Sequence, residues 1–281
     1  MPAAAPPPSF VEANGVRFAY LEEGQGPLVL LIHGFPDTAH SWDAVRPPLA
    51  AAGYRVVCPY QRGYFPTSIP QDGKYDADTL GRDVLGLIAA LGETKAIVVG
   101  HDWGASAAYA AAAIDPSRVA KLVTVAIPHP ASIKPSPKIA WAVRHFLAMQ
   151  FPWAEAHLRA HDFAHVDELV QRWSPAWKVP PGETDAVKAS FREPGSLAAA
   201  IGYYRALRVK LPSAHRRPIS VPAVSFAGLH DLIEPEYYDR AAIWFTGGYE
   251  VVRMPGGHFM HREHPEHFSR ELVRVLAPAK D

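Results

Sequence analysis

The stretch Val98-Val99-Gly100-His101-Asp102-Trp103-Gly104-Ala105 predicts a nucleophile on a sharp turn between a strand and a helix. An apolar β-branched run precedes the turn and an alanine-rich run follows it. The central residues follow the order small residue, any residue, nucleophile, any residue, small residue. Gly100 and Gly104 permit the tight turn, which then points the Asp102 side chain into a cavity.

A carboxylate at this position limits the chemistry. A serine that attacked an sp3 carbon would form an ether, which water does not cleave. Asp102 would instead form an alkyl ester, which water hydrolyses at the carboxylate's own carbonyl carbon. We therefore expect a substrate with an electrophilic sp3 carbon that carries a leaving oxygen or halide. The alternatives are an aspartate that caps the helix or a protein that has lost its nucleophile.

Short, mostly continuous apolar runs alternate with helical patterns, which predicts a mostly parallel central sheet flanked by helices. The expected strands are 28–32, 56–58, 96–99, 122–127, 223–227 and 251–254, and the expected helices are 79–91, 105–114 and 265–276. A hairpin over 10–22, with Asn14-Gly15 as its turn, starts the sheet. We expect a core of residues 1–128 and 219–281, with residues 129–218 inserted as a helical cap over the carboxyl ends of the strands.

Composition fits a neutral small-molecule substrate. The chain has 281 residues, 48% of them hydrophobic, with 28 Lys and Arg against 28 Asp and Glu. This balance gives no global field that would recruit nucleic acid or an anionic membrane. The single cysteine, Cys58, excludes an internal disulfide framework and weakly indicates a reducing compartment. No basic leader or stretch of eighteen apolar residues is present, so we expect a cytoplasmic protein, either a monomer or a homodimer.

The segment His33-Gly34-Phe35-Pro36 follows the expected strand 28–32. A tight turn at Gly34 allows the backbone N–H of Phe35 to pair with that of Trp103 as an oxyanion hole. An ordinary Gly and Pro turn is the alternative.

Two further segments complete a triad. Asp231 directly follows the strand 223–227, and His258 follows the last strand in a glycine loop. The order nucleophile, acid, histidine assigns Asp231 to orient His258, with Glu234 as the rival acid. His258, His261, His264 and His267 also recur every three residues, but Pro265 breaks the helix that would align them, so we expect no metal.

These motifs, together with Gln61-Arg62-Gly63-Tyr64, resemble the epoxide hydrolase branch of the α/β-hydrolase superfamily, which also includes haloalkane and fluoroacetate dehalogenases. The resemblance spans about Phe10 to Leu276. It implies an α/β-hydrolase core with a helical cap, no metal or cofactor, and a covalent alkyl ester on Asp102. The implied partners are a small neutral apolar epoxide and water.

The resemblance also implies two proton donors on the cap. Ile201-Gly202-Tyr203-Tyr204-Arg205 is similar to the segment that carries the second donor, so we assign Tyr204 and keep Tyr203 as the rival. His145 occupies the place where relatives usually carry a tyrosine, and a histidine and tyrosine pair is similar to a smaller bacterial subgroup. A neutral imidazole N–H can donate as a phenol does. A surface or core histidine is the alternative reading of His145.

Aromatic residues near these motifs predict apolar walls for the substrate. Phe35, Trp103, Trp141 and Phe146 are candidates, and Tyr203 is also expected to bind the substrate, although Trp141 is equally suited to the core. Haloalkane dehalogenases resemble the chain at Asp102 and Trp103. Many of them carry asparagine where Phe35 stands, and the side chain of Phe35 cannot donate a hydrogen bond to a halide. A dehalogenase and a non-catalytic ligand-binding relative remain the alternative functions.

Overall fold

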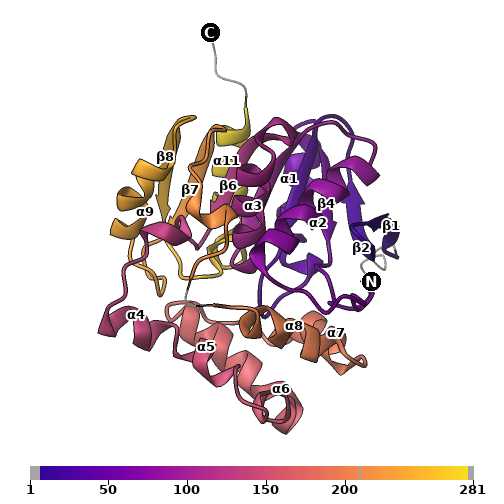
Figure 1. Cartoon of the computed structure of the whole chain (residues 1–281), viewed down its shortest axis with the longest axis vertical. Helices are drawn as coiled ribbons and strands as arrows, with labels where there is room; N and C mark the ends of the chain where they lie inside the picture. The colour runs from indigo at the N-terminus through magenta and orange to yellow at the C-terminus, as the bar shows by residue number, and fades with distance from the viewer. Residues whose placement is uncertain (1–6, 209, 278–281) are drawn as a thin grey trace.

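The computed structural model describes residues 7–208 and 210–277 and forms one eight-stranded sheet with helices around it (Figure 1). The strand order is β1-β2-β4-β3-β5-β6-β7-β8. β1 pairs antiparallel with β2 and β2 with β4, whereas the remaining neighbours are parallel. The strands are β1 (Ser9–Ala13), β2 (Val16–Glu23), β3 (Leu28–Ile32), β4 (Arg55–Pro59), β5 (Ala96–His101), β6 (Val119–Val125), β7 (Ala223–Gly228) and β8 (Tyr249–Met254).

Helices connect the strands of the core. They are α1 (Arg46–Ala51), α2 (Ala77–Ala90), α3 (Trp103–Ile114), α9 (Glu236–Arg240), α10 (Met260–Glu263) and α11 (Pro265–Leu276). α2 packs against α3, and α1 packs against α11. Because β3 leads to β4 on one side while β4 leads back to β5 on the other, right-handed crossovers place α1 and α2 on opposite faces of the sheet. The middle strands are thus covered on both faces, and all five residues of β3 are buried.

Among the described residues, five α-helices lie between β6 and β7 in the sequence and form a layer at one end of the core (Figure 1). We call them the helical layer: α4 (Pro137–Ala142), α5 (Arg144–Ala148), α6 (Ala154–Trp173), α7 (Asp185–Arg192) and α8 (Ser196–Arg205). Non-helical dihedral angles interrupt α6 from Ala160 to Phe163. The layer touches loops that follow the carboxyl ends of strands: Ser196 accepts from the Phe65 amide after β4, and the Trp173 carbonyl accepts from the His258 amide after β8.

The predicted strands and helices are present. The bounds of β3 and α11 match the prediction, and the other elements begin or end at different residues. The hairpin turns at Asn14 and Gly15, which have φ angles of 47° and 74°. The strand predicted over 122–127 ends at Val125 because Ala126 takes a φ of 67°, outside the extended region. Helix α1 was not among the predicted helices; Pro47 and Pro48 stand in its first turn, where proline is well tolerated.

No helix among the described residues is long and apolar enough to cross a membrane.

Candidate active site

The reversal in strand order places Asp102 at the centre of the sheet. β3 and β5 are neighbours, although β4 intervenes in the sequence, and the chain leaves them in opposite directions along the sheet. Ligands of open α/β sheets bind at such a point, outside the carboxyl ends of the strands. Phe35 follows β3 and Asp102 follows β5, so both predicted site residues lie at this crevice.

The turn at Asp102 requires glycine on both sides, as the sequence predicts. Asp102 has φ 51° and ψ −117°, a conformation rarely adopted by a residue with a side chain. A Cβ atom at Gly100 would lie 2.2 Å from the Gly104 carbonyl oxygen, and one at Gly104 would lie 2.2 Å from the Ile32 carbonyl oxygen. Strand and helix therefore meet at backbone contact, which fixes the direction of the Asp102 side chain.

The two carboxylate oxygens of Asp102 have different partners. Oδ1 accepts a hydrogen bond of 2.8 Å from the Phe35 amide. Oδ2 lies 3.4 Å from Nε2 of His258. The second expected oxyanion donor, the Trp103 amide, makes no hydrogen bond to this carboxylate among the described residues. Gly34 is needed here as well, since a Cβ atom there would lie 2.3 Å from the Asp102 Cβ.

The structure brings Asp231 and His258 together with Asp102. Nδ1 of His258 lies 3.1 Å from Oδ1 of Asp231, whose side chain is fully buried. The Leu232 amide donates to the same oxygen over 2.6 Å. Glu234, the rival acid, instead forms an ion pair with Lys138 at the surface. The geometry therefore favours Asp231 as the partner of His258.

The charge on His258 depends on its two carboxylate neighbours. Burial alone would lower its pKa, but the charges of Asp231 and Asp102 and the hydrogen bond with Asp231 outweigh burial and raise the pKa to about 10. At neutral pH the ring is thus an imidazolium between two carboxylates. Removing the charge of Asp102 would remove one of the causes that keep this proton bound.

Tyr203 and Tyr204 are adjacent on α8 and are both fully buried, but they have different surroundings. The Tyr203 hydroxyl donates to the Arg62 carbonyl over 2.9 Å. The Tyr204 hydroxyl has no hydrogen-bond partner among the described residues. The Tyr204 ring packs edge-on against Phe35 and Trp103, at centroid distances of 5.2 and 5.1 Å. Burial and then the Asp102 charge raise its pKa well above the ordinary value, so the phenol keeps its proton.

His145 on α5 lies beside Tyr204, with 5.7 Å between the ring centroids. It is buried, and its Nδ1 atom has no hydrogen-bond partner among the described residues. Burial lowers its pKa to about 3, against the opposing effect of Asp102, so the imidazole is neutral at physiological pH. Both predicted donors are therefore uncharged groups close to Asp102.

A cavity of about 470 Å³ reaches Asp102. Its walls include Trp103, Phe146 and Tyr203, which were predicted to line it. Further lining residues are aliphatic, among them Ile127, Ile133, Ile139, Val143, Leu207, Leu211 and Ile233, while Asp76, Asp78, Arg208, Lys210 and His215 are polar or charged. Sequence reasoning missed these aliphatic residues because nothing in their local pattern separates a cavity wall from a core position. Tyr204 and His145 do not border the cavity but pack behind its aromatic wall.

Trp141 is not part of this wall. Its side chain is 69% exposed, and the Arg144 guanidinium lies 4.2 Å from the centroid of its ring. Trp141 belongs to the short helix α4, whose buried residues are Ile139 and Ala142. The sequence places an aromatic residue near the site, but the direction of the helix turns it outward.

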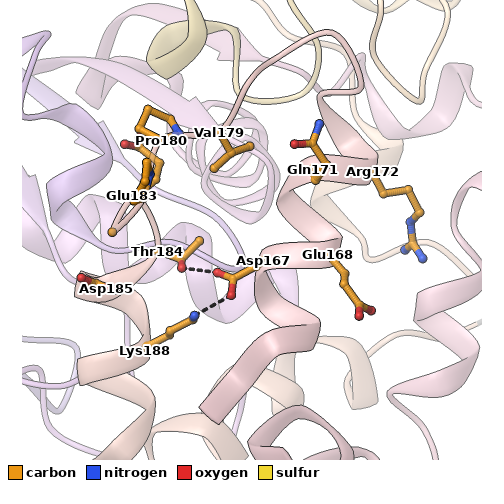
Figure 2. A pocket seen from close by; sticks show the side chains of 12 residues that line it. Asp167, Glu168, Gln171, Arg172, Val179, Pro180, Glu183, Thr184, Asp185 and Lys188 are labelled. Carbon is orange, nitrogen blue, oxygen red and sulfur yellow. Dashed lines mark hydrogen bonds and ion pairs between the residues drawn. The ribbon is translucent and has the colours of Figure 1, made fainter. Parts of the chain in front are cut away.

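A second cavity, of about 640 Å³, lies between α6 and the segment before α7 and contains none of the predicted site residues. Figure 2 shows Asp167 at its centre, where it accepts hydrogen bonds from Thr184 and Lys188. These polar groups already satisfy one another. Asp102 borders the cavity of about 470 Å³ and not this one.

Tyr64 and Trp173 are buried aromatic residues whose contacts the motifs do not predict. Tyr64 is buried, and its hydroxyl has no partner among the described residues, while its ring packs edge-on against His33 at 4.8 Å. Trp173 ends α6, accepts from the His258 amide and packs against both His145 and His258. Trp173 thus connects the helical layer with the loop that carries His258, a contact that sequence spacing does not predict.

Comparison with known proteins places this arrangement in a family. The model of the alpha/beta hydrolase fold matches residues 27–265. The AB hydrolase superfamily protein YfhM of Bacillus subtilis is 36% identical over 207 residues, which cover 71% of this chain and 72% of that protein. Epoxide hydrolase A of Mycobacterium tuberculosis is 30% identical, with 97% of this chain and 98% of that protein covered. A crystal structure of Bacillus megaterium epoxide hydrolase with an inhibitor superimposes with a TM-score of 0.85 at 25% identity, over 95% of this chain and 99% of that one.

Proposed function

Because this chain belongs to the α/β-hydrolase family, in its epoxide hydrolase branch, we propose that it hydrolyses small neutral epoxides to vicinal diols. The observation that carries the proposal is that the two carboxylate oxygens of Asp102 have different partners. The Phe35 amide holds Oδ1, while Oδ2 stays directed toward His258. One oxygen is thus placed to attack and the other to become the carbonyl oxygen of an ester.

In the first step, Oδ2 of Asp102 attacks an epoxide carbon and the ring carbon–oxygen bond breaks. The alkoxide that leaves takes a proton from Tyr204, and His145 donates a second hydrogen bond to the same oxygen. Both donors are neutral at physiological pH, and the Tyr204 hydroxyl and His145 Nδ1 are without partners among the described residues. Neither group lines the cavity, so a substrate oxygen reaches them only once the neighbouring Phe146 side chain shifts; it then satisfies two polar groups that folding has buried.

In the second step, formation of the ester removes the negative charge of Asp102. The pKa of His258 falls in consequence, and its proton, transferred through water, restores the Tyr204 phenol. Neutral His258 then takes a proton from the water that attacks the ester carbonyl carbon, and Asp231 stabilises the resulting imidazolium. The Phe35 amide stabilises the oxyanion on Oδ1, and collapse of this intermediate releases the diol.

The helical layer fits the role of a cap, as the sequence predicts for residues 129–218. It contributes Phe146 to the cavity wall and both proposed donors, whereas the core contributes Asp102, Asp231 and His258. The aliphatic lining favours an apolar substituent on the epoxide. A cap that supplies the donors can also exclude bulk water from the alkylation step.

The experiment that tests the proposal is diol formation from styrene oxide and cyclohexene oxide, with halide release from haloalkanes measured in parallel. The wild-type protein should yield diol, and Asp102→Ala should yield none. Diol from Asp102→Ala at the wild-type rate would remove the nucleophile from the mechanism. Halide without diol would instead indicate a dehalogenase with the same nucleophile.

A further inference from the structure

Three side chains that the proposed mechanism does not use meet behind the catalytic histidine. Asp37 follows β3, His101 ends β5, and His261 lies on α10. All three are buried. One nitrogen of each imidazole and one carboxylate oxygen of Asp37 lie within 4.8 Å of one another. The sequence pattern of His258, His261, His264 and His267 is unrelated to this cluster, in which only His261 takes part.

The hydrogen bonds define which nitrogen of His101 carries a proton. Nε2 of His101 lies 3.0 Å from the His258 carbonyl oxygen, which can only accept, so Nε2 must carry the hydrogen. Nδ1 of His101 therefore has a free lone pair, and it is buried with no hydrogen-bond partner among the described residues.

The same reasoning applies to His261. The Ser41 hydroxyl donates to Oδ2 of Asp37, so its oxygen accepts from Nε2 of His261, 2.7 Å away. Nδ1 of His261 is buried with a free lone pair and no hydrogen-bond partner among the described residues. Each of the two imidazoles thus has one buried nitrogen, Nδ1, without a hydrogen-bond partner among the described residues.

Asp37 has capacity for one more partner. Its Oδ2 accepts from Ser41 and from Arg262, whereas Oδ1 accepts only from the Thr38 amide among the described residues. A carboxylate oxygen has two acceptor positions, so Oδ1 keeps one of them free. Two imidazole nitrogens and a carboxylate oxygen are a common ligand set for Zn²⁺ in proteins.

The surroundings of the three residues also resemble those of a metal site. Histidines that bind metals usually donate their other ring N–H to a carbonyl, carboxylate or similar group, which orients the ring. His101 does so to the His258 carbonyl, and His261 does so to Ser41. These contacts hold the Nε2 side of both rings and leave Nδ1 as the nitrogen without a partner among the described residues.

A cleft of about 530 Å³ leads to Asp37 and His261 from the surface. Its walls carry four carboxylates, Asp37, Asp43, Glu183 and Asp185, against the single guanidinium of Arg262. Asp37 and Glu183 pair with Arg262, and Asp43 pairs with Arg46, so Asp185 is the lining carboxylate without an ion pair among the described residues. The cleft is separate from the cavity that reaches Asp102, so a cation can enter without crossing the substrate site.

We propose that Asp37, His101 and His261 bind one divalent cation of the Zn²⁺ class, with water completing the coordination. The cation joins the ends of β3 and β5 to α10 and so supports the loop that carries His258. It stabilises the fold and takes no part in the reaction.

The test uses the wild-type chain without an affinity tag, stripped by a chelator, incubated with Zn²⁺ and separated from free metal by gel filtration. We expect about one Zn²⁺ per chain. His261→Gln keeps an N–H for Ser41 but removes the imidazole, so it should retain no zinc, whereas His267→Gln should retain as much as the wild type. His258→Gln should also retain it, because the catalytic triad is not the site.

Zinc should raise the melting temperature of the wild type and of His267→Gln but not that of His261→Gln, since a ligand of the native state stabilises that state. Anomalous diffraction from wild-type crystals grown with Zn²⁺ gives a readout that needs no variant. A peak between Asp37, His101 and His261 is expected. A wild type that retains no zinc, equal retention by His261→Gln, or a peak elsewhere would overturn the proposal.

Discussion

Nε2 of His258 lies 3.4 Å from Oδ2 of Asp102, the oxygen that the Phe35 amide does not hold. In the proposed mechanism, this relationship separates the two half-reactions in time. While Asp102 is charged, His258 stays protonated and cannot act as a base. Once Asp102 is an ester, the same histidine loses a reason to keep its proton and can activate water. In the proposed mechanism, the charge of Asp102 thus determines whether His258 can act as a base.

Tyr204 and Tyr203 offer a matched pair of variants. Tyr204→Phe removes the proposed proton donor and should lower the rate of alkylation by roughly 100-fold, with little change in stability. Tyr203→Phe removes the hydrogen bond to the Arg62 carbonyl and should cost about 1 kcal/mol of unfolding free energy while alkylation proceeds. Single-turnover kinetics and denaturant unfolding measure the two effects, and the opposite assignment would reverse them.

His145 should act as a neutral donor. Its pKa is about 3, so ring opening should show no limb near pH 6.5 that belongs to this residue. The pH profile of kcat/KM for the wild type and for His145→Phe checks this expectation, and the variant should be slower at every pH above 4. A limb near pH 6.5 that disappears in His145→Phe would show a protonated imidazole and contradict the account.

The raised pKa of His258 predicts how stability depends on pH. The folded state binds this proton more tightly than the unfolded state, whose histidine has an ordinary pKa of about 6.5. The stabilisation is therefore complete below pH 6.5 and is lost as the pH rises toward 10. The difference in unfolding free energy between wild type and His258→Gln should shrink over this range. A constant difference would mean that His258 is neutral in the resting protein.

Phe146 and Trp141 test the location of the substrate site. Phe146 lines the cavity and stacks on Trp103 at a centroid distance of 6.3 Å, whereas Trp141 points to solvent. Phe146→Ala should raise KM for an aryl epoxide by about 10-fold, which corresponds to about 1.4 kcal/mol. Trp141→Ala should leave KM unchanged. Steady-state kinetics on styrene oxide measure both KM values. A higher KM for Trp141→Ala together with an unchanged KM for Phe146→Ala would contradict this location of the substrate site.

Much of the core fold follows from the sequence because buried parallel strands appear as continuous apolar runs, as in β3, whose bounds match the prediction. The glycines around Asp102 are predictable too, since backbone contact leaves no room for a Cβ atom. The outward direction of Trp141 depends on how α4 packs, which local sequence does not determine. The meeting of Asp37, His101 and His261 depends on three segments far apart in the chain, so no spacing rule finds it.

The measurement that tests the central claim most directly is the intact mass of His258→Gln mixed with excess epoxide and quenched within the first turnover. The variant should gain the mass of one epoxide, and peptide mapping should place the addition on Asp102, because the ester forms but no base hydrolyses it. Unmodified protein that still produces diol, or an adduct on any other residue, would contradict the covalent mechanism.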